Sequence, residues 1–284
     1  MKKEQNVSII SKTEVKAYLP SYPKTANKTD RGWSLIAAGQ EGMWGCGLLA
    51  CRSAYTVGSG YVTWASDDYP YQNSLQIPEA LLTRLEDKHL FDKKTAVGAG
   101  PGLGFSKAVE SFISQLKDLN LPALLDADAL TLIAQKKSFS LNKNFLLTPH
   151  TGELSRLLNV DSQTIEKNRI EYATAGAIKY NCWLLLKGYQ PLLSNGEESF
   201  LIPTGNSALG KAGAGDALTG IITGLMAQGL SIFKASALGA WLHGETAVRW
   251  LSQGKDINSL TASEIINQLP FIMSDFRSDK HPKG

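Results

Sequence analysis

Glycine is concentrated in four clusters of this 284-residue chain, and each cluster adjoins a short apolar run. The clusters lie at residues 39–47, 98–104 and 205–215 and around Gly188. An apolar run joined to a helix by a glycine-rich turn is typical of an α/β protein, because glycine lets the backbone turn tightly where a strand ends. The apolar runs show little polar alternation, which is typical of parallel strands covered by helices on both faces.

The sequence therefore predicts a doubly wound α/β fold with a mostly parallel sheet and helices on both faces. We expect strands at residues 34–38, 61–64, 95–97, 123–125, 145–147 and 183–186, and helices at 78–85, 106–119, 164–180, 214–228 and 232–250. The helix at residues 78–85 is predicted from Pro78 at its first position and the leucines that follow. Thr261 and Glu264 have the spacing of a capping box, which predicts a last helix.

The composition fits one folded domain. Hydrophobic residues make up 43% of the chain and charged residues 19%, a mixture that argues against long disordered regions. The net charge of +3 is too small for a nucleic-acid groove, and no apolar run approaches the roughly 18–20 residues of a membrane helix. The first residues have no signal-peptide core. We expect a single cytoplasmic domain over residues 1–284, with loosely held ends at 1–28 and 279–284.

The three cysteines, Cys46, Cys51 and Cys182, are odd in number and form no CxxC pair. A disulfide framework or a zinc site is therefore not expected. No histidine lies near Cys46 and Cys51 in the sequence to act as a base, so we interpret them as buried, inert thiols.

The most specific motif is the small-residue turn at residues 212–215, which is followed by Asp216 and an apolar helix. Its alanines and glycines let backbone N–H groups converge, and the positive end of the helix would point at them, so the turn is a candidate phosphoryl site. An ionised Asp216 could accept a proton from a substrate hydroxyl that attacks phosphorus. The alternative is that Asp216 only favours the helix start. The turn is not a Walker A loop, because Lys211 precedes it.

The glycine loop at residues 98–104 also follows a predicted strand and opens a helix. Its spacing departs from the G-x-G-x-x-G fingerprint, and no acidic residue follows about 20 residues later in a matching strand, so a dinucleotide-binding site is a poor fit. We expect a loop that a ligand approaches closely, the alternative being only a tight turn.

Polar residues follow two further predicted strands, at the edge where open α/β sheets bind ligands. Asp126 is either a polar strand end or a group that orients substrate or metal-bound water, and Asp128 is expected to cap the next helix. His150 and Glu153 follow a proline-fixed turn, and this position favours a functional role for His150. Glu153 could hold hydrated magnesium or could only be an acid in the first turn of a helix.

Lys187 and Gly188 end another buried strand. Lys187 offers a positive charge to a phosphate chain, and Gly188 permits backbone contact with a ligand. The alternative is a lysine that extends along apolar surface to reach water.

Five blocks of the chain, in this order, resemble those of ADP-dependent NAD(P)H-hydrate dehydratases, which belong to the ribokinase-like superfamily. The blocks are residues 100–104, 126–130, 147–153, 186–188 and 205–216. The resemblance extends from about residue 27 to the predicted helix that ends near residue 250, which is most of the chain. It implies a ribokinase-like fold without the epimerase domain that many family members carry.

The resemblance also implies a repair reaction, in which NADHX or NADPHX loses water at the expense of ADP and yields NADH or NADPH, AMP and phosphate. Asp216 would deprotonate the ring hydroxyl for phosphorylation, and the ring nitrogen would then expel phosphate. By position, the hydrate would contact Cys46, Gly102, His150 and Asp216, and the adenine nucleotide would contact Lys187, Gly188, Tyr189, Gln190, Pro191 and Gly215. The implied cofactor is Mg²⁺, with Glu153 as the candidate metal residue and ADP or ATP as co-substrate. As partners, the resemblance implies other copies of the chain in a homo-oligomer, expected to be a tetramer, and a separate NAD(P)H-hydrate epimerase.

The chain departs from the family pattern at several of these positions. Cys46 stands where alanine is usual, and Ala214 stands where threonine is usual. Residues 209–212 read Leu-Gly-Lys-Ala in place of Met-Ala-Thr-Gly, which brings Lys211 close to the phosphate loop. Residues 189–191 replace a smaller, glycine-rich stretch, so they are the departure that bears on nucleotide affinity.

Two other functions compete with this interpretation. A small-molecule kinase of the same superfamily, acting on a thiazole or pyrimidine alcohol, would typically carry asparagine at the position of His150. A non-catalytic nucleotide-binding sensor would explain the departures at Tyr189, Lys211 and Ala214. The presence of Asp216 favours an enzyme.

Overall fold

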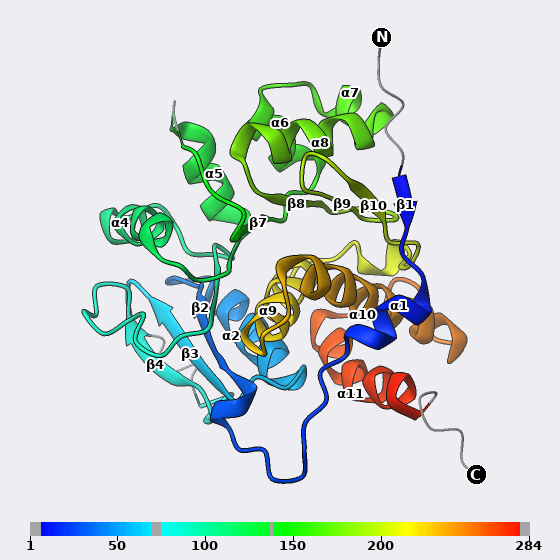
Figure 1. The fold of residues 1–284 in the computed structure, drawn as a ribbon, viewed down its shortest axis with the longest axis horizontal. Coiled ribbons are helices and arrows are strands. Elements are labelled where there is room, and N and C mark those ends of the chain that lie inside the picture. Colours follow the sequence, from blue (N-terminus) through cyan, green and yellow to red (C-terminus); the bar gives the residue numbers. More distant parts are fainter. Residues whose placement is uncertain (1–6, 70–74, 137–138, 279–284) are drawn as a thin grey trace.

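One sheet organises the computed structural model, which describes residues 7–69, 75–136 and 139–278 (Figure 1). Its ten strands lie in the order β1-β10-β9-β8-β7-β6-β5-β2-β3-β4. They are β1 (Val7–Ile9), β2 (Trp33–Ala37), β3 (Tyr61–Ser66), β4 (Leu81–Arg84), β5 (Ala96–Ala99), β6 (Ala123–Leu125), β7 (Phe145–Leu147), β8 (Trp183–Leu186), β9 (Leu192–Ser194) and β10 (Ser199–Leu201). Only β9 runs antiparallel to its neighbours, β8 and β10. The predicted mostly parallel sheet is therefore confirmed.

Helices cover both faces of this sheet (Figure 1). One face carries α4 (Lys107–Gln115), α5 (Ala127–Gln135), α6 (Thr151–Leu158), α7 (Ser162–Lys167) and α8 (Arg169–Tyr180). The other carries α1 (Lys12–Tyr18), α2 (Trp44–Thr56), α9 (Ala214–Ala227), α10 (Ile232–Ser252) and α11 (Ala262–Ser278). Three short 3₁₀ turns, at Thr29–Arg31, Leu116–Asp118 and Ser207–Leu209, complete the described elements. None of the described helices combines the length and the apolar character needed to cross a bilayer.

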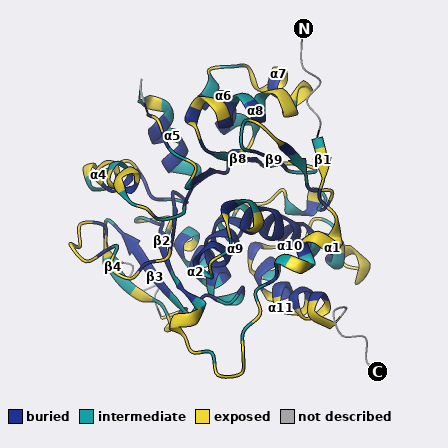
Figure 2. Cartoon of the chain, viewed as in Figure 1, coloured by how far each residue is buried: buried dark blue, intermediate teal, exposed yellow. Residues whose placement is uncertain are grey.

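The central strands are apolar throughout because successive side chains enter different cores. Leu124 packs in the core beneath α9 and α10, whereas its neighbour Leu125 packs in the core beneath α5 and α6. Leu185 and Leu186 divide between the same two cores. This two-sided burial explains the lack of polar alternation in the sequence, and α9 and α10 are themselves largely buried (Figure 2).

All six predicted strands are present, whereas the helix predicted at residues 78–85 is wrong. Leu81–Arg84 instead forms β4, which pairs in parallel with β3 at the edge of the sheet. Hydrogen bonds from a neighbouring strand outweigh the weak local preference for a helix there. The predicted helix at 164–180 is divided into α7 and α8 by Asn168, whose φ of −135° is not helical.

The segment before residue 28, which we expected to be loosely held, contains two ordered elements. β1 pairs with β10, and α1 begins with a capping box between Ser11 and Glu14 and buries Val15 completely. Short apolar stretches such as Val7–Ile9 gave no sign of a strand because only the pairing with β10 stabilises them. The rest of that expectation, at residues 1–6 and 279–284, lies outside the described residues.

Helix α9 approaches α2 closely because glycine faces the contact. A Cβ on Gly220 would overlap the backbone carbonyl oxygen of Ala50, and a Cβ on Gly224 would lie 2.8 Å from that of Ala54. Close contact at these two glycines fixes where the N-terminus of α9 lies.

We therefore expect Gly220→Ala to lower the free energy of unfolding by about 1–3 kcal/mol, because the backbone of α2 must move to admit the methyl group. Urea unfolding measures this change. Gly45→Ala in α2 is the matched control, because no atom of the described neighbours lies within 4 Å of its Cβ position. The control should be neutral or stabilising by up to about 1 kcal/mol. Equal losses in the two variants would contradict the packing argument.

Candidate active site

A cavity of about 990 Å³ opens at the carboxyl ends of β6, β7 and β8. It is lined by Asp126, Ala127, His150, Glu153, Leu185, Lys187, Gly188, Tyr189, Pro191, Thr204 to Ser207, Leu209 to Asp216, Leu218, Ala240, His243 and Gly244. Eight of the eleven predicted site residues lie in this lining: His150, Glu153, Lys187, Gly188, Tyr189, Pro191, Gly215 and Asp216. The cavity therefore lies at the edge of the sheet that the sequence predicted.

The N-terminus of α9 forms one wall of this cavity. Gly213 precedes the helix with a φ of 87°, a left-handed conformation that glycine adopts without strain. In the described part of the chain, no side chain caps the first turn of α9. The N–H of Ala214 donates to the carbonyl oxygen of Lys211 at 3.3 Å. The N–H groups of Gly215 and Asp216, together with the positive end of the helix dipole, are therefore the donors that this turn offers to an anion.

Asp216 lies in this first turn and lines the cavity. The pKa of its carboxyl group is raised, and burial is the largest cause. Asp126 also raises this pKa, whereas a hydrogen bond from Cys46 and the charge of Lys187 lower it. A carboxylate with a raised pKa is a stronger base than an exposed aspartate, because it holds an accepted proton more tightly.

Cys46 and Gly102 lie behind Asp216 and outside the cavity lining. The Cys46 thiol donates a hydrogen bond to Asp216, and burial together with Asp216 raises the pKa of Cys46 to about 12. Cys46 Sγ lies 3.1 Å from the position that a Cβ on Gly102 would take. Cys46 is thus a half-buried, protonated donor, so the prediction of a buried, inert thiol is wrong for this residue. The prediction is confirmed for Cys51, which is buried and has a raised pKa. Cys182, for which no prediction was made, is also a buried thiol with a raised pKa.

Lys187 joins two carboxylates at the floor of the cavity. Its Nζ lies 2.6 Å from Oδ1 of Asp126 and 3.6 Å from Oε2 of Glu153, and Thr219 donates to the other Asp126 oxygen at 2.9 Å. Burial lowers the pKa of Lys187, but Asp126 and Glu153 outweigh it and the net pKa is raised. The side chain is only 17% exposed, so the alternative of a lysine extending to water is wrong.

Asp128 does not cap α5, because Asp126 occupies the N-cap position. Oδ2 of Asp128 instead accepts a hydrogen bond from the N–H of Gly104 at 2.9 Å. Asp128 therefore holds the glycine loop against α5, and the expected cap is corrected to a loop contact.

His150 and Glu153 form a reciprocal cap on α6. Nδ1 of His150 accepts from the N–H groups of Gly152 and Glu153 at 3.0 and 3.3 Å, and Oε2 of Glu153 accepts from the N–H of His150 at 2.8 Å. The pKa of His150 is lowered, and burial is the largest cause. Lys187 also lowers this pKa, whereas Glu153 raises it. A neutral His150 with Nδ1 engaged carries its proton on Nε2. This nitrogen lies 3.5 Å from Oε1 of Glu153, so a ligand would share the donor with that carboxylate.

The described side chains alone do not supply enough ligands for a metal ion. No group of three or more His, Cys, Asp or Glu side chains in the described ranges could hold an ion. Asp126 and Glu153 nevertheless both line the cavity, with Lys187 as their shared cation. Mg²⁺ commonly binds one or two carboxylates together with substrate phosphates and water, so these residues fit a metal that arrives with a nucleotide.

His243, which the sequence analysis missed, supports the first turn of α9 from α10. Its Nε2 donates to the carbonyl oxygen of Ala214 at 3.0 Å, because a carbonyl can only accept. Burial lowers the pKa of His243 to about 4. The residue lies in an apolar helical stretch, where no local motif distinguishes it from core.

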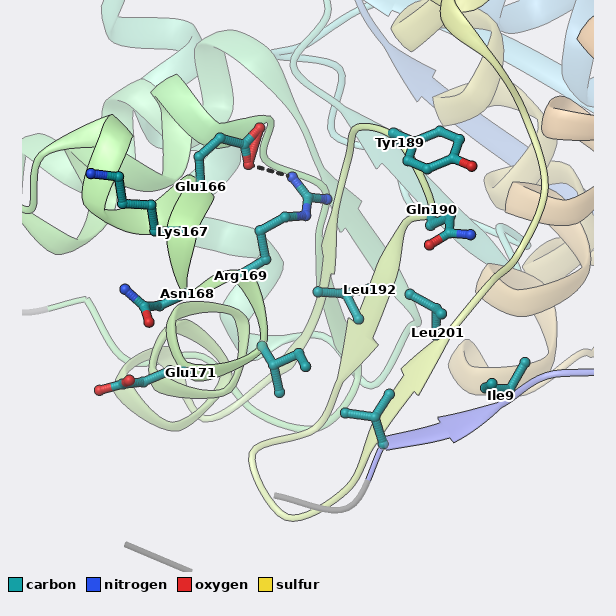
Figure 3. A pocket seen from close by; sticks show the side chains of 12 residues that line it. Ile9, Glu166, Lys167, Asn168, Arg169, Glu171, Tyr189, Gln190, Leu192 and Leu201 are labelled. Atoms are coloured by element: carbon teal, nitrogen blue, oxygen red, sulfur yellow. Dashed lines mark hydrogen bonds and ion pairs between the residues drawn. The ribbon is translucent and has the colours of Figure 1, made fainter. Parts of the chain in front are cut away.

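Gln190 and Tyr189 belong to a second, more open cavity of about 730 Å³ (Figure 3). Tyr189 lines both cavities and is 73% exposed, whereas Gln190 lines only the second. Gln190 has a φ of 53°, an uncommon conformation for a residue with a side chain. The nucleotide residues predicted at 187–191 thus extend from one cavity into the next.

Acidification should destabilise the protein through His243. Between pH 6.5 and about 4 the unfolded chain takes up a proton that folded His243 does not, so stability falls by up to about 3 kcal/mol as pH decreases. We expect His243→Gln to lose less stability than the wild type between pH 7.5 and 4.5, measured by urea unfolding. His150 shifts in the same direction but is present in both proteins. An unchanged pH dependence in the variant would contradict this role.

Comparison with known proteins identifies relatives along most of the chain. Residues 34–270 match the NAD(P)H-hydrate dehydratase family. The chain is 30% identical to the ADP-dependent (S)-NAD(P)H-hydrate dehydratase of Bacillus subtilis, over 95% of this chain and 99% of that one. It is 33% identical to a bifunctional NAD(P)H-hydrate repair enzyme of Coxiella burnetii, over 90% of this chain and 53% of that one. The chain thus spans about half the length of the bifunctional relatives it matches.

Solved structures agree with these matches. The crystal structure of the ADP/ATP-dependent NAD(P)H-hydrate dehydratase of B. subtilis, co-crystallised with ATP and Mg²⁺, superposes with a TM-score of 0.86 at 30% identity, over 95% of this chain and 99% of that one. A ribokinase-like superfamily protein of Enterococcus faecalis gives 0.83 at 22% identity, over 95% and 96% of the two chains, and shares the fold. The fold is therefore ribokinase-like, and the chain belongs to the NAD(P)H-hydrate dehydratase family.

Proposed function

We propose that this protein dehydrates NADHX and NADPHX to NADH and NADPH, with ADP as the phosphoryl donor. The observation that supports this most is Asp216, a half-buried carboxylate with a raised pKa in the first turn of α9, where no side chain of the N-cap residue occupies the N–H groups. The site thus combines a base for a hydroxyl group with a cradle for the phosphoryl group that the hydroxyl attacks. Family membership supplies the identity of the substrate.

In the proposed reaction, Asp216 accepts the proton of the ring hydroxyl while the oxygen of that hydroxyl attacks the terminal phosphorus of ADP. AMP leaves, and the hydroxyl becomes a phosphate ester. The lone pair of the ring nitrogen then expels phosphate, and loss of a proton from the adjacent ring carbon forms the double bond of NADH or NADPH. The first turn of α9 stabilises negative charge on the transferring group.

The remaining site residues divide between the two substrates. On the hydrate side, Cys46 donates a hydrogen bond to Asp216 from behind the cavity lining, and Gly102 lies against Cys46. His150, in the lining, donates to the hydrate from Nε2. Residues 187–191 and Gly215 hold the adenine nucleotide. Tyr189 and Gln190, which line the second cavity, place the distal part of the nucleotide there.

Mg²⁺ completes this proposal, with Glu153 as its protein residue in the main cavity. The metal would neutralise phosphate charge during transfer, and the protein contributes a carboxylate that α6 and Lys187 hold in place. Cytoplasmic location, a single domain, a tetramer and a separate epimerase stay predictions from the sequence.

A kinase acting on a small alcohol is the second candidate. A hydroxyethylthiazole kinase of Pyrococcus horikoshii shares the fold with a TM-score of 0.63, but at 13% identity. His150, where such kinases typically carry asparagine, favours the dehydratase.

The test is to incubate the protein with NADHX, Mg²⁺ and ADP or ATP and to follow the absorbance of NADH. Restored absorbance, with AMP formed from ADP, is the expected result. Phosphorylation of a thiazole or pyrimidine alcohol without NADH formation would favour the kinase, and nucleotide binding without turnover would favour a sensor.

Asp216→Asn should lower kcat by about 10²- to 10⁴-fold, because the amide cannot accept the proton. Calorimetry should show the dissociation constant for ADP changed by less than about threefold, since the backbone of α9 is unaltered. Asp161→Asn, at the N-cap of the surface helix α7, is the control for the substitution itself. Wild-type turnover by Asp216→Asn would exclude Asp216 as the base.

A further inference from the structure

Arg169 lies behind the turn that follows β8, on the wall of the second cavity (Figure 3). It is the first residue of α8, and its side chain is only 18% exposed. Its Nη1 donates to Oε2 of Glu166 at 2.8 Å, which Figure 3 marks as a dashed line. No motif in the sequence singled out this arginine.

The other end of the guanidinium holds the backbone of the turn. Nη2 of Arg169 donates to the carbonyl oxygens of Lys187 at 3.2 Å and of Leu186 at 3.5 Å. Gly188 follows with a φ of 130°, and a Cβ there would lie 3.0 Å from Nη1 and 3.1 Å from Nη2. The guanidinium therefore packs directly against the Lys187–Gly188 peptide, in space that a side chain at residue 188 would fill.

Residues other than Arg169 also hold the same turn in place. The N–H of Lys187 donates to the carbonyl oxygen of Pro149 at 2.8 Å, and its Nζ is bonded to Asp126. All peptide bonds in the described ranges are trans. The N–H of Gly188 must therefore point away from the Lys187 carbonyl oxygen and from Arg169. Gly188 lines the main cavity, on the other side of the turn from Arg169.

A guanidinium bonded to the carbonyl end of a peptide also polarises it. Hydrogen bonds strengthen one another along a chain, so a cation at the oxygen makes the N–H a better donor. The charge of Arg169 itself is already paired with Glu166 and lies on the second cavity. Its effect on an anion in the main cavity is thus transmitted through the peptide.

We propose that Arg169 is a positioning residue for the nucleotide: it fixes the Lys187–Gly188 peptide so that the Gly188 N–H donates to a phosphate oxygen. This inference rests on the assignment of residues 187–191 to the nucleotide under the proposed function. It assigns the turn its phosphate-binding atom and gives Arg169 a role that acts through the Lys187–Gly188 peptide and needs no contact between Arg169 and the phosphate chain.

The first test measures steady-state kinetics and ADP binding for Arg169→Met and Arg169→Lys. Arg169→Met should raise the KM and the dissociation constant for ADP about tenfold, with kcat and the KM for NADHX changed less than about threefold. Arg169→Lys should fall between Arg169→Met and the wild type, because an ammonium can still donate to one carbonyl.

Two variants of neighbouring residues are the controls. Glu166→Gln breaks the ion pair and leaves the carbonyl bonds, and it should change the ADP constants less than about twofold. Lys167→Met removes an exposed cation from the same cavity, so it reports general attraction of the anionic nucleotide. If Lys167→Met weakens ADP binding as much as Arg169→Met, or if both KM values and kcat change together, the positioning role is wrong.

A second measurement uses the wild type and needs no folded variant. Labelling with ¹³C-carbonyl lysine and ¹⁵N-glycine selects the Lys–Gly peptides, of which the chain has two, at 187–188 and 283–284. Gly284→Ala removes the second signal and so assigns the first. ADP should move the Gly188 amide proton downfield, and an unmoved signal at saturating ADP would overturn the proposal. Absence of NADH formation alongside a moved signal would instead reject the dehydratase function and keep the phosphate contact.

Discussion

The uncapped N-terminus of α9, held at the carboxyl edge of the sheet, is the constraint on which the site depends. Its position follows from backbone contact between α9 and α2, which Gly220 and Gly224 permit. The first turn of α9 then carries both the amides for an anion and Asp216. His243, from α10, bonds to the carbonyl of Ala214 in the same turn. Packing far from the cavity thus decides where this turn, with its amides and Asp216, lies at the edge of the sheet.

The charged side chains near this helix end are paired largely with one another. Lys187 is bonded to Asp126 and lies near Glu153, so most of its charge is compensated within the protein. A buried ion cluster of this kind loses hydration on folding and gains little net stability, which favours a functional reason for its presence. With Lys187 so engaged, the proposed function makes the backbone amides of α9 and of the turn after β8 the principal donors for phosphate. Arg169 acts on that second set of amides from outside the cavity.

The sequence predicted six of the ten described strands and most of the candidate site because both leave local patterns. The buried strands appear as unbroken apolar runs, and polar residues at their ends mark the cavity, as with Asp126, His150 and Lys187. β1, β4, β9 and β10 escaped prediction because pairing with neighbouring strands stabilises them rather than their own residues. His243 and Arg169 were missed for the same reason: each acts on an element distant in the sequence. The position of Cys46 came from family resemblance, and only the fold shows its bond to Asp216.

The pairing of β1 with β10 places the first described residues beside the turn at residues 187–191, which we propose holds the nucleotide. Val7 and Ile9 line the second cavity together with Tyr189 and Gln190. Any polypeptide joined ahead of residue 7 therefore starts its path at the rim of this cavity, whereas one joined after α11 starts on the opposite layer of the molecule (Figure 1). An affinity tag or a fused domain ahead of β1 is thus a steric neighbour of the second cavity, and its length would affect how freely a ligand reaches that cavity.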